Sequence, residues 1–422
     1  MINLPIALSD VSNTLQKVIM PYIRDNFPTA TILLDQIKRN AGVTFMNDAF
    51  YAPIRSRRHG GVGILGSDTA QLVSGKAAYA QLSVGVKILT GTFDISKLTI
   101  DATKTAKGAV ESQLTAQAKS LASDYAKNVN RMYFGDGSGA LAQFQGTASS
   151  SRGTAELLDA DGMAVDGRVK DRYGTINNDI SPTEYLNVGM AVTGGSASGS
   201  VGTIGTVTTS TNTIYYNADI SRAANAPIYT SDADGNAAGT LEIGGLADAL
   251  ASDIGGTSLY AGTTRATSFM SSQFGSTSEA LSLSRMEDSY LAAKKYAQTG
   301  DRYAIFVNKS LYKKYGDILT SMRRAVNESE LLGGWTGLEF AAGAGKVGVF
   351  LDYDTPDGEC LIVNLDTFTV CQVSDLDWLE NPDGGGLVRK VNYITYQATM
   401  VWFTNLLCLC PAANGKETRK TD

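Results

Sequence analysis

The hydrophobic repeat changes from two residues to three or four within residues 79–134. Apolar residues alternate with polar residues or glycine along 79–88, which predicts a strand with one apolar face. From about residue 101 to residue 134, apolar residues recur every three or four positions, which predicts a long amphipathic helix. Gly135 and Gly137 then supply helix terminators. A β arm beside so long a helix suits a subunit that reaches its neighbours better than an enzyme with a compact pocket.

Other segments predict a mixture of strands and separate helices. Residues 48–100 predict an extended hairpin, in which FYAPIRS leads to a glycine-rich tip and AYAQLSVGVKIL returns. Residues 150–245 are rich in Gly, Ser and Thr and contain short β segments, which predicts a small inserted β-barrel or sandwich. Ser284 and Glu287 form a capping box that predicts a helix from Ser284 to about Ala297.

The C-terminal part of the chain alternates between short helices and apolar β segments. YAIFV at 303–307 predicts a buried strand, and a second helix is expected to start near Asn308. After Thr369, two β segments are joined by NPDGGG, and the apolar run 398–413 predicts another buried strand. Separate helices combined with antiparallel segments predict the α+β fold class.

Composition and charge exclude several classes of protein. The chain has 422 residues, of which 43% are hydrophobic and 18% charged, so it can build ordinary cores in two or three domains. The net charge of −6 and pI near 5.1 argue against a dedicated nucleic-acid binder. The apolar run 398–413 is shorter than the ~20 residues of a membrane helix. No targeting segment is visible, so a soluble chain made in the cytoplasm is expected.

No motif marks an active site, a cofactor site or a metal site. Gly61, Gly63 and Gly66 have dinucleotide-loop spacing, but neither a helix pattern nor a suitably placed acidic residue follows, so they predict a flexible tip. Cys408 and Cys410 lie two apart on an apparent strand, which favours buried apolar residues over zinc ligands. The single histidine, His59, stands beside arginines and is more typical of surface charge than of a catalytic base. An enzyme is therefore not expected.

Three arginines near the tip of the predicted hairpin are the best interaction candidates. Arg55, Arg57 and Arg58 can form bidentate bonds with carboxylates of another subunit, although a solvated charge cluster is the plainer alternative. Acidic counterparts are available in one later stretch of the chain, at Asp375, Asp377, Glu380 and Asp383.

The order of these parts resembles the major capsid proteins of tailed bacteriophages, which have the Hong Kong 97-type fold. Residues 85–141, RYAIFVNKSLYKKYGDIL (302–319), residues 345–368 and ATMVWFTNLLCLCPAA (398–413) carry the resemblance, which spans nearly the whole chain. It implies the following parts in chain order: 1–47 an N-terminal arm, 48–100 the E-loop, 101–149 the P-domain spine helix, 150–245 an inserted β-rich domain, 246–372 the A-domain, and 373–422 the P-domain strands and C-terminus.

The resemblance also implies which residues meet other subunits. The E-loop is expected to lie on an adjacent subunit through Arg55, Arg57, Arg58, Leu82, Val84, Val86 and Ile88. The tip of the P-domain hairpin is expected at threefold contacts through Asn381, Asp383 and Gly384. The family has no cofactor, so the site residues are contacts rather than catalytic groups. Cross-linking through Lys76 or Lys87 is not predicted, because nothing marks a partner residue.

By this resemblance the chain is expected to self-assemble into hexamers and pentamers of an icosahedral shell that encloses double-stranded DNA. The implied partners are further copies of the chain, a scaffolding protein, a portal, a decoration protein in some relatives, and DNA held nonspecifically, with no membrane. The expected location is the virion, after assembly in the host cytoplasm. Two alternatives stay open: an encapsulin-like nanocompartment shell, and, more distantly, an enzyme with a β-rich binding insert.

Overall fold

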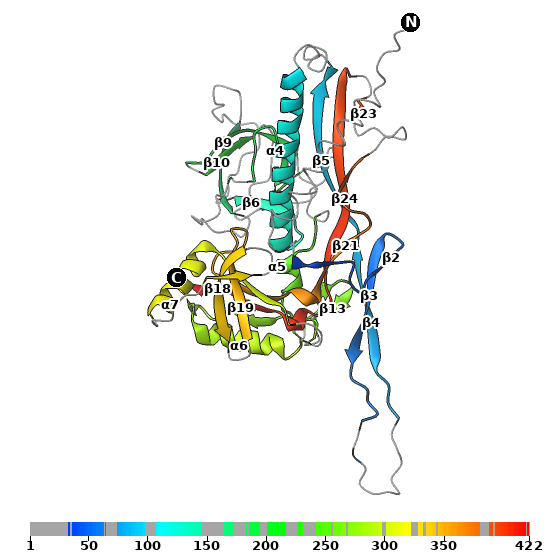
Figure 1. Cartoon of the computed structure of the whole chain (residues 1–422), viewed down its shortest axis with the longest axis vertical. Coiled ribbons are helices and arrows are strands. Elements are labelled where there is room, and N and C mark those ends of the chain that lie inside the picture. The colour runs from blue at the N-terminus through cyan, green and yellow to red at the C-terminus, as the bar shows by residue number, and fades with distance from the viewer. Residues whose placement is uncertain are drawn as a thin grey trace. The chain divides into compact units, whose positions relative to one another are not determined.

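The computed structural model of the chain divides into two compact units, each assembled from separate stretches of sequence (Figure 1). Unit 1 contains Met1–Tyr133 and Thr369–Leu407, and unit 2 contains Phe134–Phe368 and Cys408–Asp422. The α+β fold class is confirmed. The structure describes the following residues: 33, 36–62, 64, 74–97, 107–144, 164–171, 183, 185–194, 201–210, 212–216, 227–230, 242–254, 256–266, 269–297, 301–321, 328–331, 335–342, 345–379, 388–390, 393–418 and 420–421.

The main sheet of unit 1 is built around one long strand near the C-terminus. Its six strands are β1 Lys38–Arg39, β5 Lys87–Ser96, β21 Phe368–Gln372, β22 Asp377–Trp378, β23 Val388–Arg389 and β24 Thr395–Cys408. The antiparallel pair β5–β24 runs from Lys87 opposite Thr404 to Ser96 opposite Thr395. The apolar run that was predicted as a buried strand therefore forms most of β24.

Helix α4, Lys107–Phe134, covers one face of this sheet. Alternate residues of β24 are buried on that face, including Met400 and Trp402. A Cβ at Gly91 on β5 would lie 3.3 Å from side-chain atoms of both Leu121 and Tyr125 on α4, so glycine lets the helix approach closely. The predicted long helix is confirmed over Lys107–Phe134, and 101–106 lie outside the described residues.

The hairpin arm belongs to a separate three-stranded sheet in unit 1, with strand order β2-β3-β4. Its strands are β2 Thr44–Met46, β3 Ala49–Arg57 and β4 Ala78–Gly85. One continuous returning strand was predicted from Tyr79 to Ile88, but the structure has two, because the chain changes sheets at Val86. There Val86 N donates to Asp48 O at 3.2 Å, and Asn405 Nδ2 donates to Gly85 O at 2.6 Å.

In unit 2 the predicted β-rich block forms a closed barrel with strand order β10-β7-β6-β11-β8-β9. The strands are β6 Ala140–Phe144, β7 Ala164–Asp171, β8 Ala191–Gly194, β9 Val201–Thr208, β10 Thr213–Tyr216 and β11 Pro227–Thr230. Its core includes Phe144, Ile204 and Ile228, all at most 2% exposed. The barrel already begins with β6, before residue 150. Gly137, three residues after α4 ends, has a φ of 79°, a left-handed conformation that favours glycine, whereas Gly135, the other predicted helix terminator, has no positive φ.

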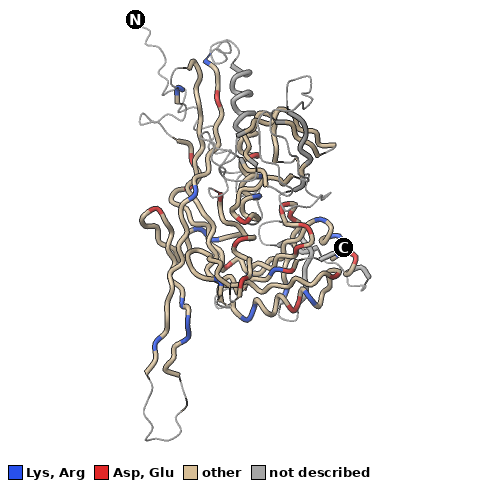
Figure 2. Tube along the Cα trace, turned by 180° about the vertical axis from the view of Figure 1, so that it is seen from behind, with Lys and Arg blue, Asp and Glu red and all other residues tan. Residues whose placement is uncertain are grey.

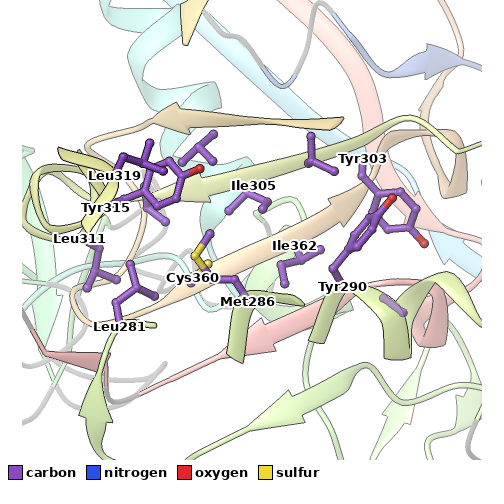
Figure 3. Close-up of a cluster of buried hydrophobic side chains, with 14 residues drawn as sticks. Leu281, Met286, Tyr290, Tyr303, Ile305, Leu311, Tyr315, Leu319, Cys360 and Ile362 are labelled. Carbon is purple, nitrogen blue, oxygen red and sulfur yellow. The ribbon is translucent and has the colours of Figure 1, made fainter. Parts of the chain in front are cut away.

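Unit 2 also contains a seven-stranded sheet with order β14-β25-β20-β16-β19-β18-β17. The strands are β14 Gln273–Gly275, β16 Tyr303–Val307, β17 Glu328–Leu331, β18 Trp335–Ala342, β19 Gly345–Leu351, β20 Cys360–Asn364 and β25 Gly415–Glu417. Helices α6 Leu283–Lys294 and α7 Lys309–Ser321 pack on one face, where Met286, Tyr290 and Tyr315 point at the sheet (Figure 3).

The central strand β16 is apolar throughout because both of its faces are covered. Tyr303, Ile305 and Val307 belong to the cluster beneath α6 and α7. On the other face, the ring of Phe306 meets Phe134 edge-on at 5.6 Å between centroids. The buried strand predicted at 303–307 and the helix predicted from Asn308 are both confirmed, and Asn308 Oδ1 accepts from Leu311 N at 3.1 Å as the N-cap.

The predicted N-cap of α6 was wrong by two residues. Its N-cap is Ser282, whose hydroxyl accepts from Arg285 N at 3.4 Å, and not Ser284. Only Ser284 has a suitable third residue, Glu287, yet the helix begins after Ser282, and Leu283 and Met286 then pack under it. Short elements complete unit 2: α5 Leu246–Ala249, β12 Leu259–Tyr260, β13 Thr263–Thr264, β15 Glu279–Ala280, η2 Leu365–Thr367, η3 Pro411–Ala413 and β26 Lys420–Thr421.

Candidate interaction surface

The base of the hairpin arm has one buried face within its own chain. In the register of β3 and β4, Phe50 lies opposite Val84 and Ala52 lies opposite Leu82. Phe50 and Ala52 are 1% exposed and Leu82 is 0% exposed, whereas Val84 is half-buried. The side chain of Leu82, predicted as an intersubunit contact, therefore packs inside its own chain here.

Farther along the arm, the side chains are exposed on both faces. Arg55 lies opposite Tyr79, but Arg57 lies opposite Ala78, because a β-bulge at Ser56 shifts the register by one residue. Without the bulge, Arg55 and Arg57 would share a face. The bulge places them on opposite faces of the two-stranded ribbon, since neighbouring residues of β4 point to opposite sides.

The three predicted arginines, Arg55, Arg57 and Arg58, are all exposed. Figure 2 shows the cationic residues along this hairpin in blue. Lys76 and His59 add to the same exposed end, and Tyr79 beside Arg55 is 74% exposed. No residue in the described part of the chain forms an ion pair or a side-chain hydrogen bond with Arg55, Arg57 or Arg58. The arm thus ends in cations and an aromatic ring that its own chain leaves in water.

Ile88, the last of the predicted apolar contacts, is not part of the hairpin. It lies on β5 directly opposite Phe403 of β24, on the face of the sheet turned away from α4. Ile88 is 62% exposed and Phe403 is 36% exposed. The predicted contact Val86 is half-buried at the junction between β4 and β5. Ile88 and Phe403 thus form an apolar cross-strand pair that faces solvent.

The acidic residues suggested as partners for the arginines have local roles or fall outside the description. Asp375 Oδ1 accepts from Arg39 Nη1 at 3.0 Å in the same chain, although both side chains remain exposed. Asp377 Oδ1 accepts from Trp378 N at 2.8 Å. The predicted hairpin-tip contacts and the remaining acids lie outside the described residues: Glu380, Asn381, Asp383 and Gly384.

Sequence patterns gave no sign of one ion pair in unit 2 whose arginine is buried and whose aspartate is partly exposed. Arg265, 2% exposed, donates to Asp248 Oδ1 at 2.7 Å and to the carbonyl oxygens of Asp248 and Ala251 at 2.6 and 3.2 Å. Its guanidinium lies 4.8 Å from the ring centre of Tyr260. Burial raises the pKa of Asp248, and Arg265 offsets only part of that rise. Arg265 thus closes the carbonyl end of α5, a structural task.

A second ion pair joins β25 to the residue that precedes β20 in the seven-stranded sheet. Lys416 Nζ lies 2.9 Å from Glu359 Oε2, and both side chains are mostly buried. Burial raises the pKa of Glu359, with the Lys416 charge acting in the opposite direction. Neither this pair nor Arg265–Asp248 combines a nucleophile with a base, so neither offers a catalytic arrangement.

The cysteines behave as buried apolar residues. Cys360, Cys371 and Cys408 are buried free thiols, and Cys410 is half-buried. Burial raises the pKa of Cys371 and of Cys408 to about 12, which leaves both thiols protonated and unreactive at neutral pH. Cys408 and Cys410 do not lie on one strand as predicted, because β24 ends at Cys408 and Cys410 precedes the turn η3.

The described part of the chain gives no support to a metal site or a membrane helix. Within it, no three His, Cys, Asp or Glu side chains are grouped so that they could hold a metal ion. None of its helices combines the length and hydropathy that crossing a membrane requires.

The chain is similar in structure to capsid proteins of tailed bacteriophages. Against the capsid asymmetric unit of cyanophage A-1(L), the TM-score is 0.48 with 12% identity and 93% of each chain covered. Against the capsid of Myoviridae phage XM1, the TM-score is 0.42 with 9% identity, covering 92% of this chain and 91% of that chain.

An encapsulin is matched over a smaller region. The holo-SrpI encapsulin complex from Synechococcus elongatus PCC 7942 gives a TM-score of 0.28 and 11% identity, over 35% of this chain and 53% of that chain. No protein-family model and no curated protein matches the sequence. At TM-scores below 0.5, these likenesses decide neither the family nor the function of the chain.

Proposed function

We propose that this chain is a structural shell protein, the major capsid protein of a tailed bacteriophage with a Hong Kong 97-type fold. The observation that carries the proposal is the sheet β5–β24 under α4, continued along the chain into an arm whose far end is exposed on both faces. An exposed ribbon is a ready partner for another copy, and a closed assembly covers it. The order of elements supports the proposal, since it follows the order on which the sequence resemblance depends.

In this proposal each part of the chain has a place in the shell. Residues 1–47 are the N-terminal arm and 48–100 the E-loop that lies on a neighbour. Residues 101–149 and 373–422 form the P-domain, 246–372 form the A-domain, and 150–245 are an inserted β-rich domain. The closed barrel supports the last assignment, because its first and last strands, β6 and β11, are hydrogen-bonded neighbours. The chain can therefore leave the barrel beside the point at which it enters.

The proposed contacts between copies use residues of unit 1. Arg55, Arg57 and Arg58 contact carboxylates of a neighbouring copy, and Ile88 with Val84 and Val86 adds apolar area. Asn381, Asp383 and Gly384 form the threefold contact. Repeated contacts of this kind close hexamers and pentamers into an icosahedral shell. The role is structural, without catalysis or a cofactor.

The shell encloses double-stranded DNA, held by confinement because the chain is acidic overall. A scaffolding protein and a portal take part in assembly in the host cytoplasm, a decoration protein is a further partner, and the mature location is the virion. No membrane is involved.

The test is assembly of the full chain, expressed alone and together with the proposed scaffolding protein. Sedimentation velocity is expected to show large particles, and negative-stain microscopy is expected to show that they are closed and built from pentamers and hexamers. A chain that stays single at high concentration, with and without scaffold, overturns the proposal. Particles that hold protein cargo, lack a portal and contain no nuclease-protected DNA favour the encapsulin-like compartment instead.

A further inference from the structure

The far end of the arm differs from its base in both shape and charge. At the base, Phe50, Ala52 and Leu82 occupy one buried face, so the ribbon there is an apolar flap. Beyond Ile54 no described side chain of the arm is buried. The bulge at Ser56 then turns Arg55 and Arg57 to opposite faces.

The charge of the arm is opposite to that of the rest of the chain. Residues 49–86 contain four cations, Arg55, Arg57, Arg58 and Lys76, and one acid, Asp68, which gives a net charge of +3. The whole chain carries −6, so the residues outside 49–86 carry −6 minus +3, or −9. Copies of the chain are therefore complementary in charge when the arm of one meets the body of another.

We propose that the end of the arm is a two-faced cationic finger that inserts between acidic surfaces of other copies of this chain. The inference rests on the proposed function, and it adds that the contact covers both faces of the arm. The bulge carries this point, because an arm made to lie flat on one surface would place Arg55 and Arg57 on the same side. Exposed Tyr79, Val62 and Ile64 at the same end supply apolar area around the ion pairs.

Assembly of charge-reversed full-length chains tests the finger. Arg55→Glu and Arg57→Glu are each expected to raise the protein concentration needed for half-maximal assembly by about tenfold or more, since like charges then meet. The fold should be unaffected, because neither arginine has a partner in the described part of its own chain. Lys313→Glu on α7 changes an equally exposed cation and is the matched control, expected to assemble as the unchanged chain does.

Salt and cross-linking add independent readouts. Raising NaCl from about 0.05 M to about 0.5 M shortens the range of charge interactions and is expected to weaken assembly of the unchanged chain, with a smaller effect on Arg55→Glu. Carbodiimide joins amines to carboxylates in direct contact, so mixed isotopically labelled copies should yield Lys76 linked to Asp or Glu of a different copy.

The possible contrary results distinguish failure of the cationic-finger inference from failure of the proposed shell function. Particles that form regardless of salt and of both reversals leave the proposed function intact and refute the inference. An effect of only one arginine refutes the two-faced contact, and an equal loss in Lys313→Glu refutes assignment to the arm. Reversals that leave assembly intact but reduce nuclease-protected DNA assign the cations to nucleic acid. If the unchanged chain forms no particle under any condition, the proposed function itself fails.

Discussion

Asp248 accepts a 2.7 Å hydrogen bond from the buried Arg265, yet the pKa of Asp248 is raised rather than lowered. Burial disfavours the carboxylate more than the guanidinium stabilises it. The ion pair therefore fixes the geometry of α5 without making ionised Asp248 favourable for folding. This balance, and four other features of the packing, lead to measurable predictions.

The first prediction concerns pH. Because the folded pKa of Asp248 lies above its unfolded value of 3.8, the stabilising contribution of this group is fully present below pH 3.8 and is lost as pH rises through the folded pKa. The difference in unfolding free energy between the unchanged chain and Asp248→Asn should thus fall with rising pH in that window. Chemical denaturation at a series of pH values measures it, and a difference that rises instead contradicts the raised pKa.

Removal of the guanidinium tests the other half of the pair. Arg265→Met removes the guanidinium donor from the carbonyl oxygens of Asp248 and Ala251, and Asp248 O keeps its bond from Ala251 N. The substitution should lower the unfolding free energy by about 2–3 kcal/mol. Arg285→Met breaks the exposed pair with Glu279 and is the control, expected to cost under about 1 kcal/mol. Equal losses in the two variants would show that burial of Arg265 adds nothing.

Asn414 links three parts of unit 2 from a position that is 0% exposed. Its Oδ1 accepts from Asn364 N at 2.7 Å, and its Nδ2 donates to Thr367 Oγ1 and Cys410 O. Asn414→Ala should cost about 2–4 kcal/mol, because the Asn364 N–H stays buried without an acceptor. Asn414→Asp should not restore stability, since a carboxylate cannot donate. Thermal and urea unfolding measure both variants. Asn187→Ala, at an exposed position, is the control and is expected to leave the unfolding free energy nearly unchanged.

Two strand glycines should respond oppositely to a larger side chain. Gly91→Val pushes against Leu121 and Tyr125 on α4 and should destabilise the fold by about 1–3 kcal/mol. A Cβ at Gly85 meets no atom within 4 Å, so Gly85→Val should be neutral or slightly stabilising, because valine loses less entropy on folding. Denaturant midpoints compare them. A tolerated valine at Gly91 would mean that α4 does not lie so close to β5.

Lys87 is predicted to make the fold sensitive to alkaline pH. Burial lowers the pKa of Lys87, so between that folded pKa and 10.5 the unfolded chain binds more protons, and stability from this group rises with pH. Lys87→Met should flatten that rise and be more stable than the unchanged chain below the window. The measurement is urea unfolding across alkaline pH, where parallel profiles for the two chains would speak against a desolvated ammonium group.

Substitutions at two adjacent residues of β5 are expected to affect folding stability and assembly separately. Leu89 is 8% exposed beneath α4, so Leu89→Ala should cost about 2–4 kcal/mol in unfolding free energy. Ile88 is 62% exposed, so Ile88→Ala should change stability by under about 0.5 kcal/mol while reducing the yield of assembled particles. Calorimetry of unassembled chains and sedimentation of assembly mixtures give the two readouts. Unchanged assembly in Ile88→Ala would remove this residue from the interface.

Elements whose signal is local could be predicted from the sequence alone. The repeat along α4, the fully apolar β16 and the long β24 each follow from side chains that must be buried or exposed with a fixed period. The turn-rich composition of 150–245 likewise predicted a β-barrel or sandwich. The exposed arginines of the arm were also found in this way, because charged side chains rarely lose their water without a partner.

Only the tertiary structure decided the features that depend on residues far apart in the chain. The strand expected from Tyr79 to Ile88 is divided at Val86 because Gly85 is bonded to Asn405 and β5 pairs with β24. The opposite facing of Arg55 and Arg57 depends on a one-residue shift against β4, which no periodicity records. The hydrophobic pattern specifies which face of an element is buried, whereas pairing and register are fixed by the free energy of contacts that form only when the whole chain has folded.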